Sequence, residues 1–170
     1  MNLKVRFSLR LWLGSLILKL IKREIVMEII EGNDKILSSV AEEVPFGDDV
    51  KGLVSEMWKV LHGHPRAVGL AADQVGILRR VILVKDNGFV SEIINPVITR
   101  TSGKDKQSKE GCLSYPGKIE AMRRRSWVVV EGYDIDWKPI KKKCRGLLSY
   151  IIQHEIDHLN GTTIKNHKEI

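Results

Sequence analysis

The feature that most constrains this chain is the stretch Q-H-E-I-D-H-L-N-G at residues 153–161 of 170. It contains the pattern H-E-x-x-H. In a helix, His154 and His158 lie four residues apart and therefore one above the other on a single face. Two imidazoles placed in this way can bind one divalent metal ion, and Glu155 between them can reach a water on that metal. The stretch therefore predicts a metal site carried by a helix.

Apolar residues before the motif support the helical interpretation. Two adjacent stripes at helical spacing run from residue 147 to residue 159: Leu147, Ile151, His154 and His158 in one, and Leu148, Ile152, Glu155 and Leu159 in the other. Asn160 and Gly161 follow, and a glycine just past the last helical turn is a common helix end. The alternative for the motif is a pair of solvated histidines at a helix end.

A tetrahedral metal site needs a third protein ligand besides the two histidines and leaves a fourth position open for water. The extended zinc-peptidase motif would place a histidine at position 164, but this chain has Ile164 there. The third ligand is therefore expected upstream, at Cys112 or Cys144. Gly111 gives the backbone before Cys112 unusual freedom, which favours Cys112. Either cysteine could instead be a small buried apolar side chain.

Three blocks of the sequence together resemble the motifs of one family, the peptide deformylases. These motifs are G-x-G-L-A-A-x-Q, E-G-C-L-S and Q-H-E-x-D-H-L-x-G. The corresponding blocks here are A-V-G-L-A-A-D-Q at residues 67–74, E-G-C-L-S at 110–114 and the stretch at 153–161. The second and third blocks match throughout, and the resemblance covers roughly residues 29–164. Three long motifs in the right order are far more specific than H-E-x-x-H alone.

The resemblance implies a metal-dependent hydrolase that removes the N-formyl group from nascent peptides beginning with formylmethionine and releases formate. The implied site residues are Cys112, His154 and His158 as metal ligands, Glu155 as the catalytic acid–base, and the Gln74 amide with the backbone N–H of Leu113 as oxyanion donors. The implied cofactor is one divalent ion per chain, Fe²⁺ or Zn²⁺, for which Ni²⁺ or Co²⁺ could substitute.

The chain departs from the family pattern at a few positions. Ala67 stands where the family shows glycine, and Asp73 occupies the variable position before Gln74. Some deformylases carry a substrate-contacting arginine seven residues after the metal-binding cysteine, and here that position is Ile119. Arg124 aligns better with a second basic position of the family. The run of three arginines around it is more typical of a solvated face than of a surface that meets ribosomal RNA or the peptide backbone.

Apolar side chains around the three motifs could form a pocket for a methionine side chain. The residues expected to bind substrate in this way are Val68, Gly69, Leu147, Tyr150 and Ile151. Helical spacing places the last three near the face of His154. Ordinary core packing is the alternative for the same residues.

The expected fold class is α+β, with antiparallel β-strands wrapped around the central helix that carries H-E-x-x-H. Asn87 and Gly88 predict a hairpin between strands at residues 80–84 and 91–100, in which Pro96 indicates an edge or a bulge. A helix capped by Asp48 is expected over residues 50–61, and strands are expected at 127–133 and 139–145. Residues 28–44 are expected to be extended and then to form a loop, and residues 67–76 and 101–108 are expected to be loops.

Residues 27–170 are expected to form the peptide deformylase-like catalytic domain, which leaves residues 1–26 as an extension. The extension is basic and apolar, and its status has three interpretations: upstream sequence that is not translated, an amphipathic membrane or targeting segment, or an added element of the fold. It carries six basic side chains and one acidic one, so +5 of the net charge of +7 belongs to it. The remaining +2 argues against a bulk nucleic-acid-binding protein.

Two cysteines give no disulfide framework and favour a reducing compartment, so a cytoplasmic location is expected. Membrane or organelle association is expected only if residues 1–26 are genuine. The chain is also expected to be a monomer. The expected partners are nascent formyl-Met peptides and the ribosome near its exit tunnel. No specific DNA partner is expected. Two other functions stay open: a small H-E-x-x-H metallopeptidase and a non-catalytic deformylase-like binding module.

Overall fold

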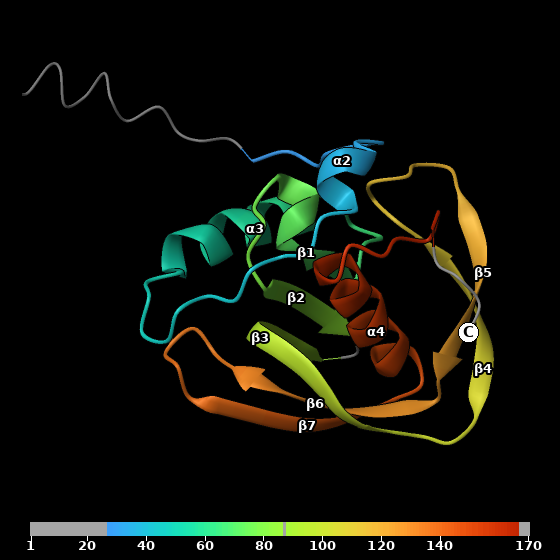
Figure 1. The fold of residues 1–170 in the computed structure, drawn as a ribbon. Coiled ribbons are helices and arrows are strands. Elements are labelled where there is room, and N and C mark those ends of the chain that lie inside the picture. The colour runs from blue at the N-terminus through green and yellow to red at the C-terminus, as the bar shows by residue number, and fades with distance from the viewer. Residues whose placement is uncertain (1–26, 87, 167–170) are drawn as a thin grey trace, which may run out of the picture.

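The computed structural model describes residues 27–86 and 88–166. In these residues, antiparallel strands surround one long C-terminal helix, α4 (Leu147–Leu159), as the predicted α+β class requires (Figure 1). None of the helices in this part of the chain is long and apolar enough to cross a membrane. The interpretations of residues 1–26 fall outside the described residues.

Within residues 27–166, apart from residue 87, seven strands form two sheets. The larger sheet has the order β1-β2-β3-β6-β7, and the smaller one is the two-stranded ribbon β4-β5. Their bounds are β1 (Gly69–Ala71), β2 (Val81–Asp86), β3 (Phe89–Thr101), β4 (Asp105–Gly111), β5 (Ile119–Arg125), β6 (Trp127–Tyr133) and β7 (Pro139–Arg145). All neighbouring strands are antiparallel. Helix α4 contacts strands of both sheets and lies between them (Figure 1).

Strand β2 shows why the sheet sits at the centre of the molecule. Its Val-Ile-Leu-Val run is buried on both faces. Ile82 and Val84 pack in the cluster that includes α4, whereas Val81 and Leu83 pack in the cluster of α3 (Lys51–Gly63). A continuous apolar run is what a strand covered on both faces needs. The sheet therefore has α4 over one face and α3 over the other.

Several predicted elements are confirmed. The hairpin pairs β2 with β3 as far as Asp86 and Phe89, and Gly88 has a φ of +83°. Pro96 marks a bulge, because the register of β3 against β6 shifts between Ile94 and Val97; the edge interpretation is wrong, since β3 lies between β2 and β6. Helix α4 ends at its predicted residue, and Gly161 follows with a φ of +71°.

Other local predictions are wrong, each for a physical reason. Residues 28–44 contain a one-turn helix, α2 (Asp34–Leu37), whose Leu37 is fully buried. Asp48 does not cap α3; the helix follows Val50, and the carboxylate of Asp49 accepts the N–H of Lys51 at 3.0 Å. Helix α2 is stabilised by one buried side chain, and the start of α3 by the carboxylate of the residue next to Asp48. Neither feature produces a periodic pattern in the sequence.

The loops expected at residues 67–76 and 101–108 are largely ordered elements. The first contains β1 and a 3-10 helix, η1 (Ala72–Val75), which ends at Gly76 with a φ of +84°. The second contains most of β4, which pairs with β5 along its whole length. Strand β4 reads D-K-Q-S-K-E-G and buries only one side chain, so its sequence carries no alternating apolar signal.

Candidate functional site

The end of β4 and one face of α4 bring together three side chains that could hold a metal ion. The ligand atoms of Cys112, His154 and His158 all lie within 4.8 Å of one another. The Cys112 Sγ lies 3.2 Å from Nε2 of His158, and the thiol is only 9% exposed. One thiolate and two imidazoles are a ligand set for a tetrahedral metal site with a fourth position open. Cys144 lies elsewhere, fully buried in the core between the sheet and α4.

Each histidine of this group has a carboxylate at its other ring nitrogen. Nδ1 of His154 lies 3.0 Å from Oε2 of Glu110, and Nδ1 of His158 lies 3.0 Å from Oδ2 of Asp73. A carboxylate that accepts the Nδ1 proton leaves Nε2 with a free lone pair and fixes the orientation of the ring. Neither carboxylate was assigned a role from the sequence, since only the fold brings β4 and η1 to the two histidines.

The pKa values follow from this packing. Burial raises the pKa of the Cys112 thiol, but hydrogen bonds with His154 and His158 outweigh burial and bring it down to about 6. Burial lowers the pKa of His154, but contacts with Cys112 and Glu110 raise it to about 9. These shifts favour a Cys112 thiolate beside positively charged histidines, and the thiolate is the form of cysteine that binds metals.

Arg124 corrects the interpretation of the arginine run as a solvated face. It is 3% exposed, and its guanidinium binds both carboxylate oxygens of Glu110, at 2.9 and 2.8 Å, as well as the carboxylate of Asp157. Burial raises the pKa of Glu110, but hydrogen bonds from Arg124 and His154 hold it at about 2. A chain of contacts thus runs from Arg124 through Glu110 to His154, while Arg123 beside it is exposed.

Replacing Arg124 with methionine should lower the free energy of unfolding by about 3–5 kcal/mol, because Glu110 would remain buried without its cation. Urea unfolding in the presence of a chelator measures this loss without any contribution from a bound metal. Arg123→Met on the same strand is the matched control and should change stability by less than about 0.5 kcal/mol. Equal effects of the two substitutions would contradict the buried ion pair.

Glu155 lies against strand β1 in a space that only glycine leaves open. Its side chain is 4% exposed, and Oε2 is buried with no hydrogen-bond partner among the described residues. Burial raises the pKa of Glu155 to about 7, in the range where a carboxyl group can both accept and donate a proton. A Cβ added to Gly69 would meet the Glu155 carboxylate, with Cδ at 2.8 Å and Cγ2 of Ile151 at 2.9 Å.

Gly69→Ala should therefore displace Glu155. A displacement of about 1 Å at a reacting group can reduce turnover about 100-fold, and we expect a loss of this size with metal content unchanged. Steady-state kinetics with metal analysis tests the prediction. Gly63→Ala is a suitable control, since apart from its chain neighbours and the backbone of its own helix no described atom lies within 4 Å of the added Cβ. Activity within twofold of the unmodified protein for Gly69→Ala would show that this contact is not needed.

Gln74 is held by η1 beside the cysteine. Its Oε1 accepts the N–H of Ala71 at 2.9 Å, which leaves Nε2 to donate toward Cys112 Sγ at 3.4 Å and Ser114 Oγ at 3.3 Å. The side chain is 2% exposed, so its amide is fixed in place by the fold. Leu113 follows the cysteine directly and lines the same cavity as Gln74.

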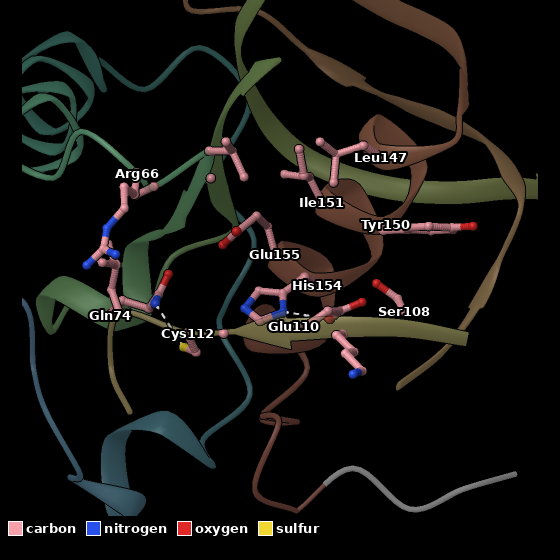
Figure 2. A pocket seen from close by; sticks show the side chains of 16 residues that line it. Arg66, Gln74, Ser108, Glu110, Cys112, Leu147, Tyr150, Ile151, His154 and Glu155 are labelled. Carbon is pink, nitrogen blue, oxygen red and sulfur yellow. Dashed lines mark hydrogen bonds and ion pairs between the residues drawn. The ribbon is translucent and has the colours of Figure 1, made fainter. Parts of the chain in front are cut away.

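A cavity of about 320 Å³ opens over these groups. Its lining includes the polar or reactive groups of Gln74, Cys112, Leu113, His154 and Glu155. It also includes Ala67, Val68, Gly69, Leu147, Tyr150 and Ile151, together with Arg66 and Ser108. Leu147 and Ile151 lie at the opposite end from Cys112 and Gln74 (Figure 2). The five residues that the sequence suggested for substrate binding thus share this cavity, whereas Ile119 does not line it and is 71% exposed.

Comparisons with known proteins agree with this geometry. The profile described as polypeptide deformylase matches residues 26–169. The peptide deformylase of Pelotomaculum thermopropionicum is 43% identical over 137 residues, which cover 80% of this chain and 87% of that protein. Peptide deformylase 1 of Pseudomonas syringae is 38% identical over 140 residues, which cover 80% and 83% of the two chains.

Solved structures are similar over the same region. PDF from the Vibrio parahaemolyticus bacteriophage VP16T, solved in complex with actinonin, has 48% identity and a TM-score of 0.78, covering 81% of this chain and 99% of that one. The Synechococcus elongatus peptide deformylase, also in complex with actinonin, has 33% identity and a TM-score of 0.79, covering 87% and 81%. Motifs, fold and relatives agree, and the chain belongs to the polypeptide deformylase family.

Proposed function

We propose that Cys112, His154 and His158 hold the single divalent metal ion with which this chain catalyses the reaction of its family. That reaction is the hydrolytic removal of the N-formyl group from the N-terminal formylmethionine of nascent peptides, with release of formate. The observation that carries the proposal is the approach of the three ligand atoms to within 4.8 Å of one another, with a carboxylate on the far nitrogen of each histidine. Outer partners of this kind accompany most metal-binding histidines.

The donor set also limits the choice of metal. A thiolate with two imidazoles suits Fe²⁺ or Zn²⁺, and Ni²⁺ or Co²⁺ fits the same ligands. Both cysteines are free thiols, and the site needs Cys112 reduced, which supports a reducing compartment such as the cytoplasm.

The bound metal would supply Lewis acidity, which polarises the formyl carbonyl and makes water a stronger acid. Glu155 takes one proton from the attacking water as the water oxygen bonds to the formyl carbon. The side-chain N–H of Gln74 and the backbone N–H of Leu113 donate to the oxygen that becomes negative in the tetrahedral intermediate. Glu155 then delivers the proton to the leaving nitrogen, the C–N bond breaks, and formate and a free N-terminus result.

The apolar end of the cavity suits the methionine side chain that follows the formyl group. Val68, Leu147 and Ile151 would surround its thioether, with Tyr150 beside them. Since two similar enzymes were solved in complex with actinonin, we expect actinonin to bind in this cavity as well. A monomer that works near the ribosomal exit tunnel, without specific DNA binding, is the setting that we propose for this activity.

Two peptides that differ only at the N-terminus test the assignment. Formate release from formyl-Met-Ala-Ser, with no cleavage of Met-Ala-Ser, is the result expected for the proposed function. Cleavage of a peptide bond in the unformylated peptide would instead identify a metallopeptidase. Stoichiometric metal without turnover of either peptide would identify a binding module. The protein should be prepared without oxygen in Fe²⁺, Ni²⁺ and Zn²⁺ forms, so that metal oxidation does not mask activity.

A further inference from the structure

Asp73 is a buried carboxylate that the reaction itself does not use. It lies in η1, is 0% exposed, and its Oδ2 is 3.0 Å from Nδ1 of His158. The Nε2 of the same ring is 3.2 Å from Cys112 Sγ, so the ring lies between the carboxylate and the thiol. The second oxygen, Oδ1, is buried and has no hydrogen-bond partner among the described residues.

The two carboxylates that contact the histidines differ in their surroundings. Glu110 binds Arg124 through both oxygens, so a buried cation offsets its charge. Asp73 forms its only ion pair, within the described part of the chain, with His158. A buried carboxylate without full compensation is unfavourable, and among the described residues no lysine or arginine pairs with Asp73, so its charge acts mainly on the ring of His158.

A divalent ion at the proposed site would provide the missing positive charge. The charge of Asp73 would act on the metal through His158. An imidazole whose Nδ1–H is hydrogen-bonded to a carboxylate is more basic at Nε2 and therefore binds a metal ion more strongly through that nitrogen. The 3-10 helix that carries Asp73 also carries Gln74, so a single short element would hold both a metal ligand's partner and an oxyanion donor.

On the basis of the proposed metal site, we propose that Asp73 is a positioning residue that fixes His158 with Nε2 toward the metal and strengthens its hold on the ion. The charge and the hydrogen bond contribute separately. Asp73→Asn keeps the side-chain size and one oxygen acceptor but removes the charge, whereas Asp73→Leu removes both. Metal affinity should therefore be highest in the unmodified protein, lower in Asp73→Asn and lowest in Asp73→Leu.

Competition between the protein and a chelator for Co²⁺ measures this order, and the visible spectrum of bound Co²⁺ reports the ligand field at the same time. We expect Asp73→Asn to weaken Co²⁺ binding about 10- to 100-fold and to shift the Co²⁺ bands. Ser149→Ala is the matched control, since Ser149 is also fully buried and hydrogen-bonded on α4 but contacts neither histidine. It should leave affinity within twofold and the spectrum unchanged.

The outcomes separate the two proposals. Affinity and spectrum that stay unchanged in Asp73→Asn would overturn the role of Asp73, while Co²⁺ bound to the unmodified protein would still support the metal site. Absence of Co²⁺ binding by the unmodified protein would overturn both. Thermal unfolding of the metal-free variants identifies misfolding, and a natively folded variant with weakened Co²⁺ binding supports the proposal. If Asp73→Asn misfolds, Ser149→Ala serves as the comparison. An equally unstable Ser149→Ala protein with the same loss of Co²⁺ affinity would count against the role of Asp73.

Discussion

Glu155→Gln should abolish formate release while the protein still binds its metal. The substitution keeps the size of the side chain but removes the group that accepts and returns the proton. General acid–base groups contribute about 10²–10⁴ to rates, and here one group serves both the attack and the departure of the amine. We therefore expect kcat to fall at least about 10³-fold. The metal ligands are untouched, so metal content should stay at one ion per chain.

The structure makes Glu155→Gln a clean test. Oε2 has no hydrogen-bond partner in the described residues, so the amide breaks no network on that oxygen. Glu131→Gln provides the same chemical change at β6, where the carboxylate pairs with Lys141 at 2.7 Å and does not line the cavity. That control should keep normal turnover. A Glu155→Gln protein with more than a tenth of the normal kcat would show that another group moves the proton.

Cys112→Ala should remove both the metal and the activity. The substitution leaves only two protein ligands, so affinity should fall by more than the roughly 10- to 100-fold that follows loss of an outer partner. Metal analysis after gel filtration, together with formate release at micromolar metal, measures both effects. Turnover by Cys112→Ala should reappear only at metal concentrations high enough to load the two remaining histidines.

Cys144→Ala is the matched control for Cys112→Ala, because both thiols are buried. Cys144 packs in the core under α4, so its loss should cost stability but no metal. If the Cys144 variant lost metal and the Cys112 variant kept it, the assignment of the third ligand would be wrong.

The parts of this site that the sequence predicts are the local ones. His154, Glu155 and His158 lie on one helix, so spacing alone gives their arrangement. The hairpin of β2 and β3 is equally local, since it depends on one turn and on a short apolar run. The resemblance to deformylases identified Cys112 as the third ligand, whereas spacing alone left both Cys112 and Cys144 as candidates.

The parts that the sequence did not predict depend on contacts between distant segments. The resemblance singles out Arg124 from Arg123 and Arg125 only as a basic position, and its burial follows from the contacts of β5 with Glu110 and with Asp157 of α4. Asp73 stands in the sequence only as a departure at a variable position of the motif, and its contact with His158 depends on where the fold places η1. The ribbon of β4 and β5 was missed because ladder hydrogen bonds, rather than alternating apolar side chains, define it.

Formate release from formyl-Met-Ala-Ser before and after removal of the metal tests the central claim most directly. The protein would be loaded with Fe²⁺ without oxygen, assayed, stripped with a chelator, and assayed again before and after one equivalent of Fe²⁺ is returned. We predict turnover that disappears with the metal and returns with one ion per chain. Undiminished turnover by the metal-free protein would contradict the claim, because Glu155 alone cannot activate water against a formamide.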